Sequence, residues 1–448
     1  MAANRAWLLV GLAAVVAYVS WFTWALEHRD YQTWGTLMIG PLLVVVSVPL
    51  LGQAVRREPD RRIGALIVGA FFLKLAMAFV NHAVAFGIYG GVADARGYHG
   101  AGTAYSEAFR AGHFALSGDA QLGRRFISAV TGALYTITGP SKLVGYLVFS
   151  WFAFWGLYLF YRAFVLAVPE GDRRRYALLV FLLPSTLFWT SAIGKEAWMT
   201  LALGTCAVGA ARLLTHRRGG MPVLALGLAG SALCRPHISF MVLMGVAGAY
   251  LLRRSATPKP LGPLVTIGGL FVLVAIGSAL AGQFARHFEL TSFGTQTSRS
   301  VLEVAERESE IGRSAFSVER TPWPLAVPGV LVRPLPFEAH NAQALAASFE
   351  GTAMLVLLAA SRRRVAAAAR RIVATSYLAF CATSSILFLV AFSVFRNFGI
   401  LARERVQLLP FVLVLLALPA AQRSGPLRRF GPPPLGAGPE TVGAHRRA

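Results

Sequence analysis

Residues 143–193 read LVGYLVFSWFAFWGLYLFYRAFVLAVPEGDRRRYALLVFLLPSTLFWTSAI. Two apolar runs, 143–161 and 176–193, flank a short loop that carries three successive arginines, Arg173 to Arg175. A run of about twenty apolar residues has the length that crosses a bilayer as a helix. Arginines in a short loop mark the cytoplasmic side of a membrane protein. This stretch therefore predicts a helical hairpin that crosses the membrane twice around a cytoplasmic turn.

The same alternation repeats along the chain, because Arg and Lys clusters follow every second apolar run. We therefore predict an all-α polytopic membrane protein with about twelve transmembrane helices and both termini in the cytoplasm. Residues 126–138 are apolar but too short to span, and we interpret them as a re-entrant or interfacial helix. The predicted spans are 6–26, 34–54, 63–88, 143–161, 176–193, 197–214, 221–234, 238–252, 262–284, 343–360, 372–395 and 406–421.

Composition supports this class of protein and excludes others. The chain of 448 residues is 56 % hydrophobic and only 14 % charged, whereas a water-soluble domain carries about 25 % charged residues. Most of the net charge of +23 falls in the predicted cytoplasmic segments. We attribute it to topology and to attraction to anionic membrane lipids, so nucleic acid is not an expected partner. Cys206, Cys234 and Cys381 all fall in apolar runs and indicate core packing rather than disulfides or a metal site.

The chain divides into one membrane domain, 1–421, and a tail, 422–448. The first apolar run lacks the small residues of a cleavage site, so we expect an uncleaved span. Two long outer loops are predicted at 89–125 and 285–342. The second contains a capping box at Ser300 and Glu303 that predicts a surface helix over 300–313. The prolines that follow are expected to prevent regular helix near the outer interface, and the tail, rich in Pro, Gly and Arg, is expected to be disordered.

The first outer loop carries the strongest candidate for chemistry. Asp94 lies a few residues beyond the third span, with Tyr98 and His99 one turn further on if the segment is helical. A carboxylate there can act as general base on a sugar hydroxyl, or hold a divalent cation such as Mg²⁺ or Mn²⁺ against a phosphate. The alternative is an ordinary helix-capping or solvated aspartate.

A second group of charged residues is predicted at the outer ends of several spans. Lys195 and Glu196 lie in a very short turn, where Lys195 can bind a phosphate and Glu196 can orient it or polarise an acceptor. Guanidinium groups pair two phosphate oxygens at once, so converging arginines predict a site for a phosphate or pyrophosphate. The alternative is that these basic residues only neutralise acidic residues on the outer side of the membrane. The remaining candidates for this group are Arg235, His237, Arg396, Arg403 and Arg405.

Two charges fall within predicted spans. Lys74 lies near the middle of the third span, with Asn81 and His82 on the same helical face, and Glu350 lies well inside the tenth. Charges at such depth are costly and mark a partner or a pathway. We expect Lys74 and Glu350 to form a buried pair, with a structural role as plausible as a functional one.

Three stretches carry a resemblance to a known family. They run through Asp94, Tyr98 and His99, from Pro184 through Trp189 and Ser191 to Lys195 and Glu196, and from Arg403 to Pro410. There the chain resembles the polytopic membrane glycosyltransferases of the GT-C class. The resemblance implies a polyprenyl-phosphate-linked sugar donor and a glycan or protein acceptor. It also implies Asp94 as the base, with Lys195, Arg235 and Arg403 as phosphate ligands. In size and span number the chain is also similar to Wzy-type polysaccharide polymerases, which use lipid-pyrophosphate-linked glycans.

The sequence thus favours a glycosyltransferase that acts on the extracytoplasmic face of a bacterial plasma membrane. No phosphate-binding P-loop, HExxH zinc motif or serine-hydrolase elbow is present in the sequence, which favours a lipid-linked donor. A transporter or flippase of lipid-linked sugars is the main alternative, although we find neither an internal repeat nor an interrupted helix, which such proteins often have. A non-catalytic membrane subunit is a third possibility.

Overall fold

The computed structural model describes residues 2–91, 93–114, 122–252, 323–339, 342–393 and 398–419. Every regular element in these ranges is a helix. Four predictions lie outside the described residues: the span at 262–284, the surface helix at 300–313, the tail from 422, and Arg396.

The elements follow one another along the chain with short connections. They are α1 (Ala2–Glu27), α2 (Tyr31–Arg56), α3 (Arg61–His82), η1 (Ala83–Ile88), α4 (Asp94–Arg110), α5 (Leu122–Thr138), α6 (Lys142–Ala167), α7 (Arg173–Leu182), α8 (Pro184–Phe188), α9 (Lys195–Leu214), α10 (Gly220–Ala232), α11 (Pro236–Leu252), α14 (Trp323–Val332), η2 (Pro336–Glu338), α15 (Ala342–Ala360), α16 (Arg362–Arg371), α17 (Ser376–Phe392) and α18 (Phe398–Leu416). Here η1 is a π-helical turn that continues α3, and η2 is a 3₁₀ turn.

Several of these helices have the length and composition of membrane spans. Four qualify, namely α2, α3 with η1, α6 and α9, and the pair α15–α16, bent by 65°, makes a fifth if it is one span. On α2 the large apolar side chains of Leu42, Val45 and Val48 are exposed. A continuous apolar surface of this kind suits contact with lipid rather than water. The chain is therefore a helical membrane protein.

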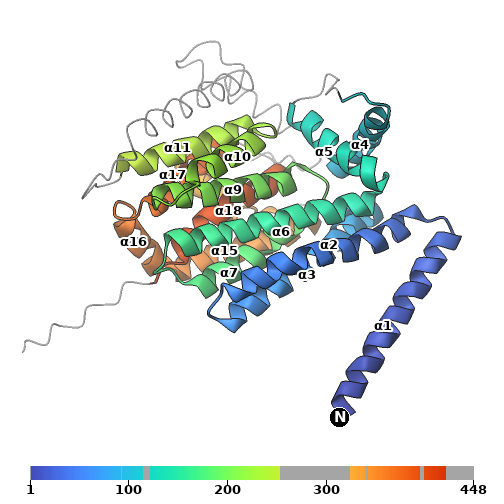
Figure 1. Ribbon diagram of the computed structural model, residues 1–448. Coiled ribbons are helices and arrows are strands. Elements are labelled where there is room, and N and C mark those ends of the chain that lie inside the picture. Colours follow the sequence, from blue (N-terminus) through green and yellow to red (C-terminus); the bar gives the residue numbers. More distant parts are fainter. Residues whose placement is uncertain are drawn as a thin grey trace, which may run out of the picture.

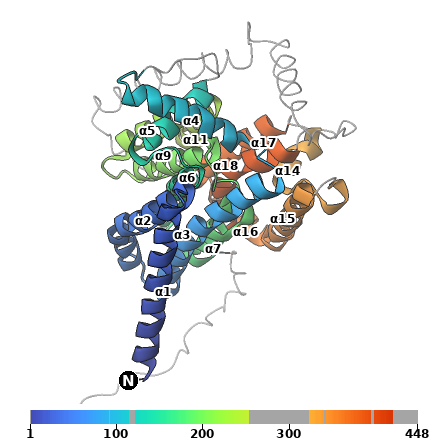
Figure 2. The same ribbon diagram turned by 90° about the vertical axis from the view of Figure 1, so that its right-hand side faces the viewer.

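Within the bundle, α9 lies between α6 and α10 and packs against both (Figure 1). Glycines allow this approach: a Cβ added to Gly204 on α9 would lie 2.3 Å from the carbonyl oxygen of Gly156 on α6. Small residues let helix backbones approach closely within membranes, where dispersion contacts replace the hydrophobic effect as the driving force. In both views α1 runs away from this body, whereas α4 and α5 lie together at one end of it (Figures 1 and 2).

Gly204→Ala is expected to destabilise the protein by about 1–3 kcal/mol, the usual cost of overpacking a core. Backbone atoms surround Gly204, so no flexible side chain can move aside. Gly69→Ala on α3 is the matched control, since nothing lies within 4 Å of the added Cβ. Thermal unfolding of the two purified variants in one detergent measures the difference. Equal midpoints would contradict this account of the α6–α9 contact.

The fifth predicted span, 176–193, is not one continuous helix. It breaks between α7 and α8 at Leu183–Pro184, and residues 189–194 leave the helical conformation. The proline explains the first break, because the residue before a proline is pushed out of the α region; Leu183 has φ −64° and ψ 125°. The expectation that no helix is interrupted is therefore wrong.

Buried polar groups hold the short helix α8 at both ends. The Lys74 ammonium on α3 donates hydrogen bonds to the carbonyl oxygens of Thr186 (2.9 Å) and Leu187 (2.8 Å), and also to the Thr190 hydroxyl. Asn81, two turns further along α3, donates to the carbonyl oxygen of Phe188 at 2.7 Å. A positive charge is favourable beside the free carbonyl oxygens at the end of a helix, and a negative charge is favourable beside the free amides at its start.

The predicted Lys74–Glu350 pair is wrong. Glu350 on α15 accepts a hydrogen bond from the Ser185 amide at the other end of α8, and its second oxygen lies 3.6 Å from Arg405. Lys74 and Glu350 therefore bind opposite ends of the same short helix, because its free carbonyls need a cation and its free amide needs an anion.

Three other segments differ from the sequence prediction. The predicted loop 89–125 contains α4 and the start of α5, which pack against each other. The proline-rich segment forms α14, which tolerates Pro324 in its first turn, where no helical amide donor is needed. The last helix begins at Phe398 rather than near 406, because Glu404 and Arg405 have buried partners and do not belong to a loop.

Candidate functional site

A cavity of about 780 Å³ lies between α3, η1, α4, α6, the segment after α8 and the start of α18. Its wall combines apolar and aromatic side chains with a few charged groups, the usual composition of a small-molecule site. The lining residues are Asn81, Val84, Ala85, Tyr89, Gly91, Ala93, Asp94, Ala95, Arg96, Gly97, Tyr146, Phe188, Trp189, Ala192, Ile193, Gly194, Glu196, Gly399, Ile400 and Arg403.

Helix α18 sends three successive charged side chains in three directions. Each residue of an α-helix is rotated by about 100° from the previous one. Arg403 accordingly meets Asp94 on α4, Glu404 meets Arg235 after α10, and Arg405 turns to Glu350 on α15. The helical conformation of this segment therefore decides which charges reach the cavity.

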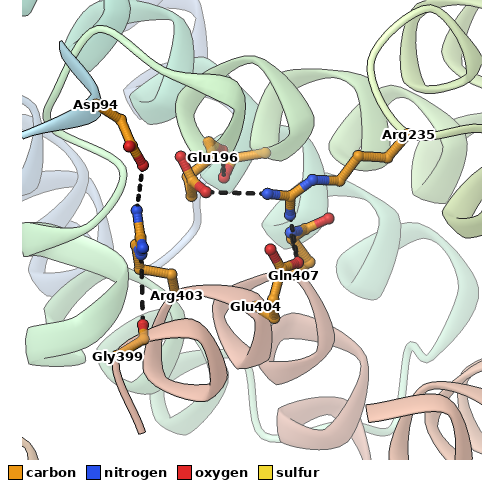
Figure 3. A network of polar contacts seen from close by, with 8 residues as sticks. Asp94, Glu196, Arg235, Gly399, Arg403, Glu404 and Gln407 are labelled. Carbon is orange, nitrogen blue, oxygen red and sulfur yellow. Dashed lines mark hydrogen bonds and ion pairs between the residues drawn. The ribbon is translucent and has the colours of Figure 1, made fainter. Parts of the chain in front are cut away.

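The first part of the site is a buried network around Arg235 (Figure 3). Arg235 pairs with Glu196 at 3.1 Å and with Glu404, and these three side chains are only 11 %, 15 % and 13 % exposed. Gln407, one turn along α18, donates to Glu404 at 2.8 Å. Burial alone would lower the pKa of Arg235, but the carboxylates of Glu404 and Glu196 outweigh it and raise this pKa. Arg235 is thus a permanently charged centre between two carboxylates.

The second part is an exposed ion pair between Asp94 and Arg403 (Figure 3). The side chain of Asp94 is 69 % exposed and that of Arg403 is 34 % exposed. Asp94 is the first residue of α4, and Arg403 also donates from its Nε to the Gly399 carbonyl oxygen of its own helix at 3.3 Å. Both residues line the cavity.

Two other predicted residues lie on α4. Tyr98 is buried next to the charged cluster, where burial, followed by the charges of Glu196 and Asp94, raises the pKa of its hydroxyl. His99 faces α5, where its Nδ1 forms a 2.9 Å hydrogen bond with the Tyr135 hydroxyl. The segment is helical, but His99 lies on another side of the helix from Asp94 and is not among the cavity-lining residues.

The predicted cations do not all converge. Lys195 is half-buried at the start of α9, and it is not among the residues that line the cavity. Among the residues that the structure describes, Lys195 has no ion pair. His237 is half-buried in the first turn of α11. Arg405 is buried elsewhere, where it also donates to the Arg333 carbonyl oxygen at 3.0 Å.

The described residues do not fit a resident Mg²⁺ or Mn²⁺ ion. Within the described ranges, no group of three or more His, Cys, Asp and Glu side chains could hold a metal. The available carboxylates are engaged by guanidinium groups, Asp94 by Arg403, and Glu196 and Glu404 by Arg235.

Sequence reasoning missed several residues of the site. Glu404 was not among the predicted site residues, although an acid among basic residues in an apolar surrounding signals an internal pair. The aromatic wall, Tyr89, Tyr146, Phe188 and Trp189, gave no distinguishing signal, because aromatic residues are common in membrane helices. Its members come from the end of η1, from α6 and from the end of α8.

Comparison with protein-family models, with curated proteins and with solved structures finds no match to this chain.

Proposed function

We propose that the protein is a membrane glycosyltransferase that transfers a sugar from a polyprenyl-phosphate-linked donor to a glycan or protein acceptor. The observation that supports it best is the composition of the 780 Å³ cavity. Asp94, Glu196 and Arg403 line it together with Tyr89, Phe188 and Trp189. Aromatic faces suit the apolar C–H faces of a sugar ring, and the charged groups suit its hydroxyls and a phosphate.

The proposed mechanism gives Asp94 and Arg403 separate tasks. Asp94 takes the proton from the acceptor hydroxyl as general base. The acceptor oxygen then bonds to the anomeric carbon, and the bond from that carbon to the lipid phosphate breaks. The electron pair leaves with the phosphate, whose charge is stabilised by Arg403. Glu196 stays paired with Arg235 and fixes that side of the cavity.

The proposed topology has about twelve spans with both termini in the cytoplasm. The chain would then lie in a bacterial plasma membrane with the cavity on the extracytoplasmic face, where lipid-linked sugars are used. The basic loops support this orientation. A Wzy-like polymerase, which joins lipid-pyrophosphate-linked repeat units, is the related alternative, because the same cations suit a pyrophosphate.

Asp94→Asn is expected to lower transfer by at least about 100-fold, the range of a lost general base, while the protein still accumulates in the membrane. Mass spectrometry of lipid-linked glycans in cells carrying each variant measures this. The donor should build up, and its size distinguishes a single sugar from a repeat unit. Glu107→Gln, which removes an exposed carboxylate from the same helix α4, is the matched control. An unchanged profile with Asp94→Asn would refute the base role.

A transporter of lipid-linked sugars remains the second candidate, and one observation favours it. The interrupted helix α7–α8 ends beside the cavity, and discontinuous helices next to a binding site are common in transporters. Purified protein in detergent separates the two functions. A transferase forms product from donor and acceptor in one compartment, whereas a transporter forms none.

A further inference from the structure

The two parts of the site differ in how easily they can open. Arg235 is enclosed with Glu196 and Glu404, and separating buried charges leaves each without compensation. In the second pair Asp94 is 69 % exposed and Arg403 is 34 % exposed, and ion pairs that solvent reaches contribute less to stability than enclosed ones. An incoming anion can therefore replace a carboxylate on Arg403 far more easily than on Arg235.

The surroundings of Arg403 leave room for such an exchange. The Nε of Arg403 donates a hydrogen bond to the Gly399 carbonyl oxygen, which fixes one edge of the guanidinium group. Its Nη1 donates to the Asp94 carboxylate at the cavity. Asp94 follows Gly90 and Gly91, whose φ angles of +59° and +80° are ones that glycine adopts without strain. The carboxylate thus begins a helix next to a glycine turn, whereas Arg403 is anchored. In an exchange, Asp94 is the group that moves.

We propose that, in the site without donor, the Asp94 carboxylate binds Arg403 at the position that the donor's phosphate takes when the donor binds. Binding of a phosphate or pyrophosphate exchanges the two anions, and the displaced Asp94 is then free to accept the acceptor's proton. This inference rests on the proposed function for the identity of the ligand and of the base. It adds that the base is held by Arg403 until a donor is bound, so a site without donor does not activate a hydroxyl or water.

The test is the binding of inorganic pyrophosphate to the purified full-length protein, measured by calorimetry in four forms. These are wild type, Asp94→Asn, Arg403→Gln and the double variant. Asp94→Asn, which removes the competing carboxylate, is expected to tighten binding about fivefold, which corresponds to the free energy of one exposed ion pair. Arg403→Gln is expected to weaken binding more than about tenfold, the usual scale of a charge-assisted hydrogen bond. In the double variant Asp94→Asn should no longer tighten binding, since the two effects are coupled.

Two further variants guard against simpler explanations. Arg403→Lys keeps a cation but not the paired nitrogens, so intermediate affinity is expected even if Arg403→Gln folds poorly. Glu107→Gln removes another carboxylate from α4 and is expected to leave the affinity unchanged. A short-chain prenyl pyrophosphate is the probe for the lipid source, and the apolar wall should make it bind more tightly than inorganic pyrophosphate.

The outcomes separate this inference from the proposed function. If Asp94→Asn tightens binding equally with and without Arg403, Asp94 merely repels anions and the exchange is refuted. Weaker binding in Asp94→Asn, or no binding in any variant, also overturns it. Equal affinity for the two probes refutes a lipid-linked ligand. A coupled cycle together with an unchanged lipid-linked glycan profile in Asp94→Asn would support the exchange of anions on Arg403 and refute the role of Asp94 as the base of the proposed transferase.

Discussion

Replacing Arg235 by methionine is expected to remove nearly all folded protein from the membrane fraction. The change leaves Glu196 and Glu404 buried next to each other without the guanidinium that compensates both. Breaking one buried ion pair typically costs about 3–5 kcal/mol, and here two carboxylates lose their partner at once. The total stability of a protein is often only about 5–15 kcal/mol. Fluorescence-detected size-exclusion chromatography of the tagged variant measures the loss.

The matched control for Arg235→Met removes all three charges together. In the triple variant with Glu196→Gln and Glu404→Gln the side chains keep similar shapes, and neutral amides replace the carboxylates. Replacing a complete buried ionic group by neutral residues is often close to neutral for stability, so the triple variant should accumulate again. Normal accumulation of the single Arg235→Met variant would show that the ion pairs of Arg235 with Glu196 and Glu404 are not needed for folding. Failure of the triple variant would show that the charges themselves are needed.

Much of the helical layout could be predicted from apolar runs alone. The runs at 34–54, 63–88, 143–161 and 197–214 correspond to α2, α3 with η1, α6 and α9. The match holds although Pro41 and Pro49 lie inside α2 and α3 passes into the π-helical turn η1, because the apolar runs are long enough to form spans. The break before Pro184 had a local signal in the proline itself. No local signal in the sequence indicates that residues 189–194 also leave the helical conformation. This second break depends on partners in α3 and α15 that are distant in sequence.

Four charged residues of the site could be predicted from the sequence, but their pairings could not. Asp94, Glu196, Arg235 and Arg403 were each chosen for their charge near a predicted membrane edge, and the structure brings them into one region. The sequence could not predict that the arginines would already be paired with carboxylates. It also could not predict that Arg405 would turn away, because the segment before residue 406 was interpreted as a loop. Helical rotation by about 100° per residue separates neighbouring charges that a loop would leave together.

Lys74→Met is expected to destabilise the protein and to impair the cavity. The substitution removes the donor for the carbonyl oxygens of Thr186 and Leu187 and for the Thr190 hydroxyl. Each buried polar group left without its partner costs about 1–3 kcal/mol, and the lysine is only 1 % exposed, so water cannot replace it. The same helix end carries Phe188 and Trp189 of the cavity wall. Thermal unfolding and the lipid-linked glycan profile should therefore both change.

Lys142→Met provides the comparison for Lys74→Met. Lys142 is half-buried on α6, and its ammonium lies 4.7 Å from the centre of the Phe86 ring. A cation–π contact of this kind contributes only about 0.5–1 kcal/mol at an accessible site, so its loss should leave stability and glycan profile nearly unchanged. If Lys74→Met matched this control in both measurements, α8 would be held by Asn81 and by Glu350 without the lysine. A loss of stability with a normal glycan profile would make Lys74 important for the fold but not for the position of the cavity wall.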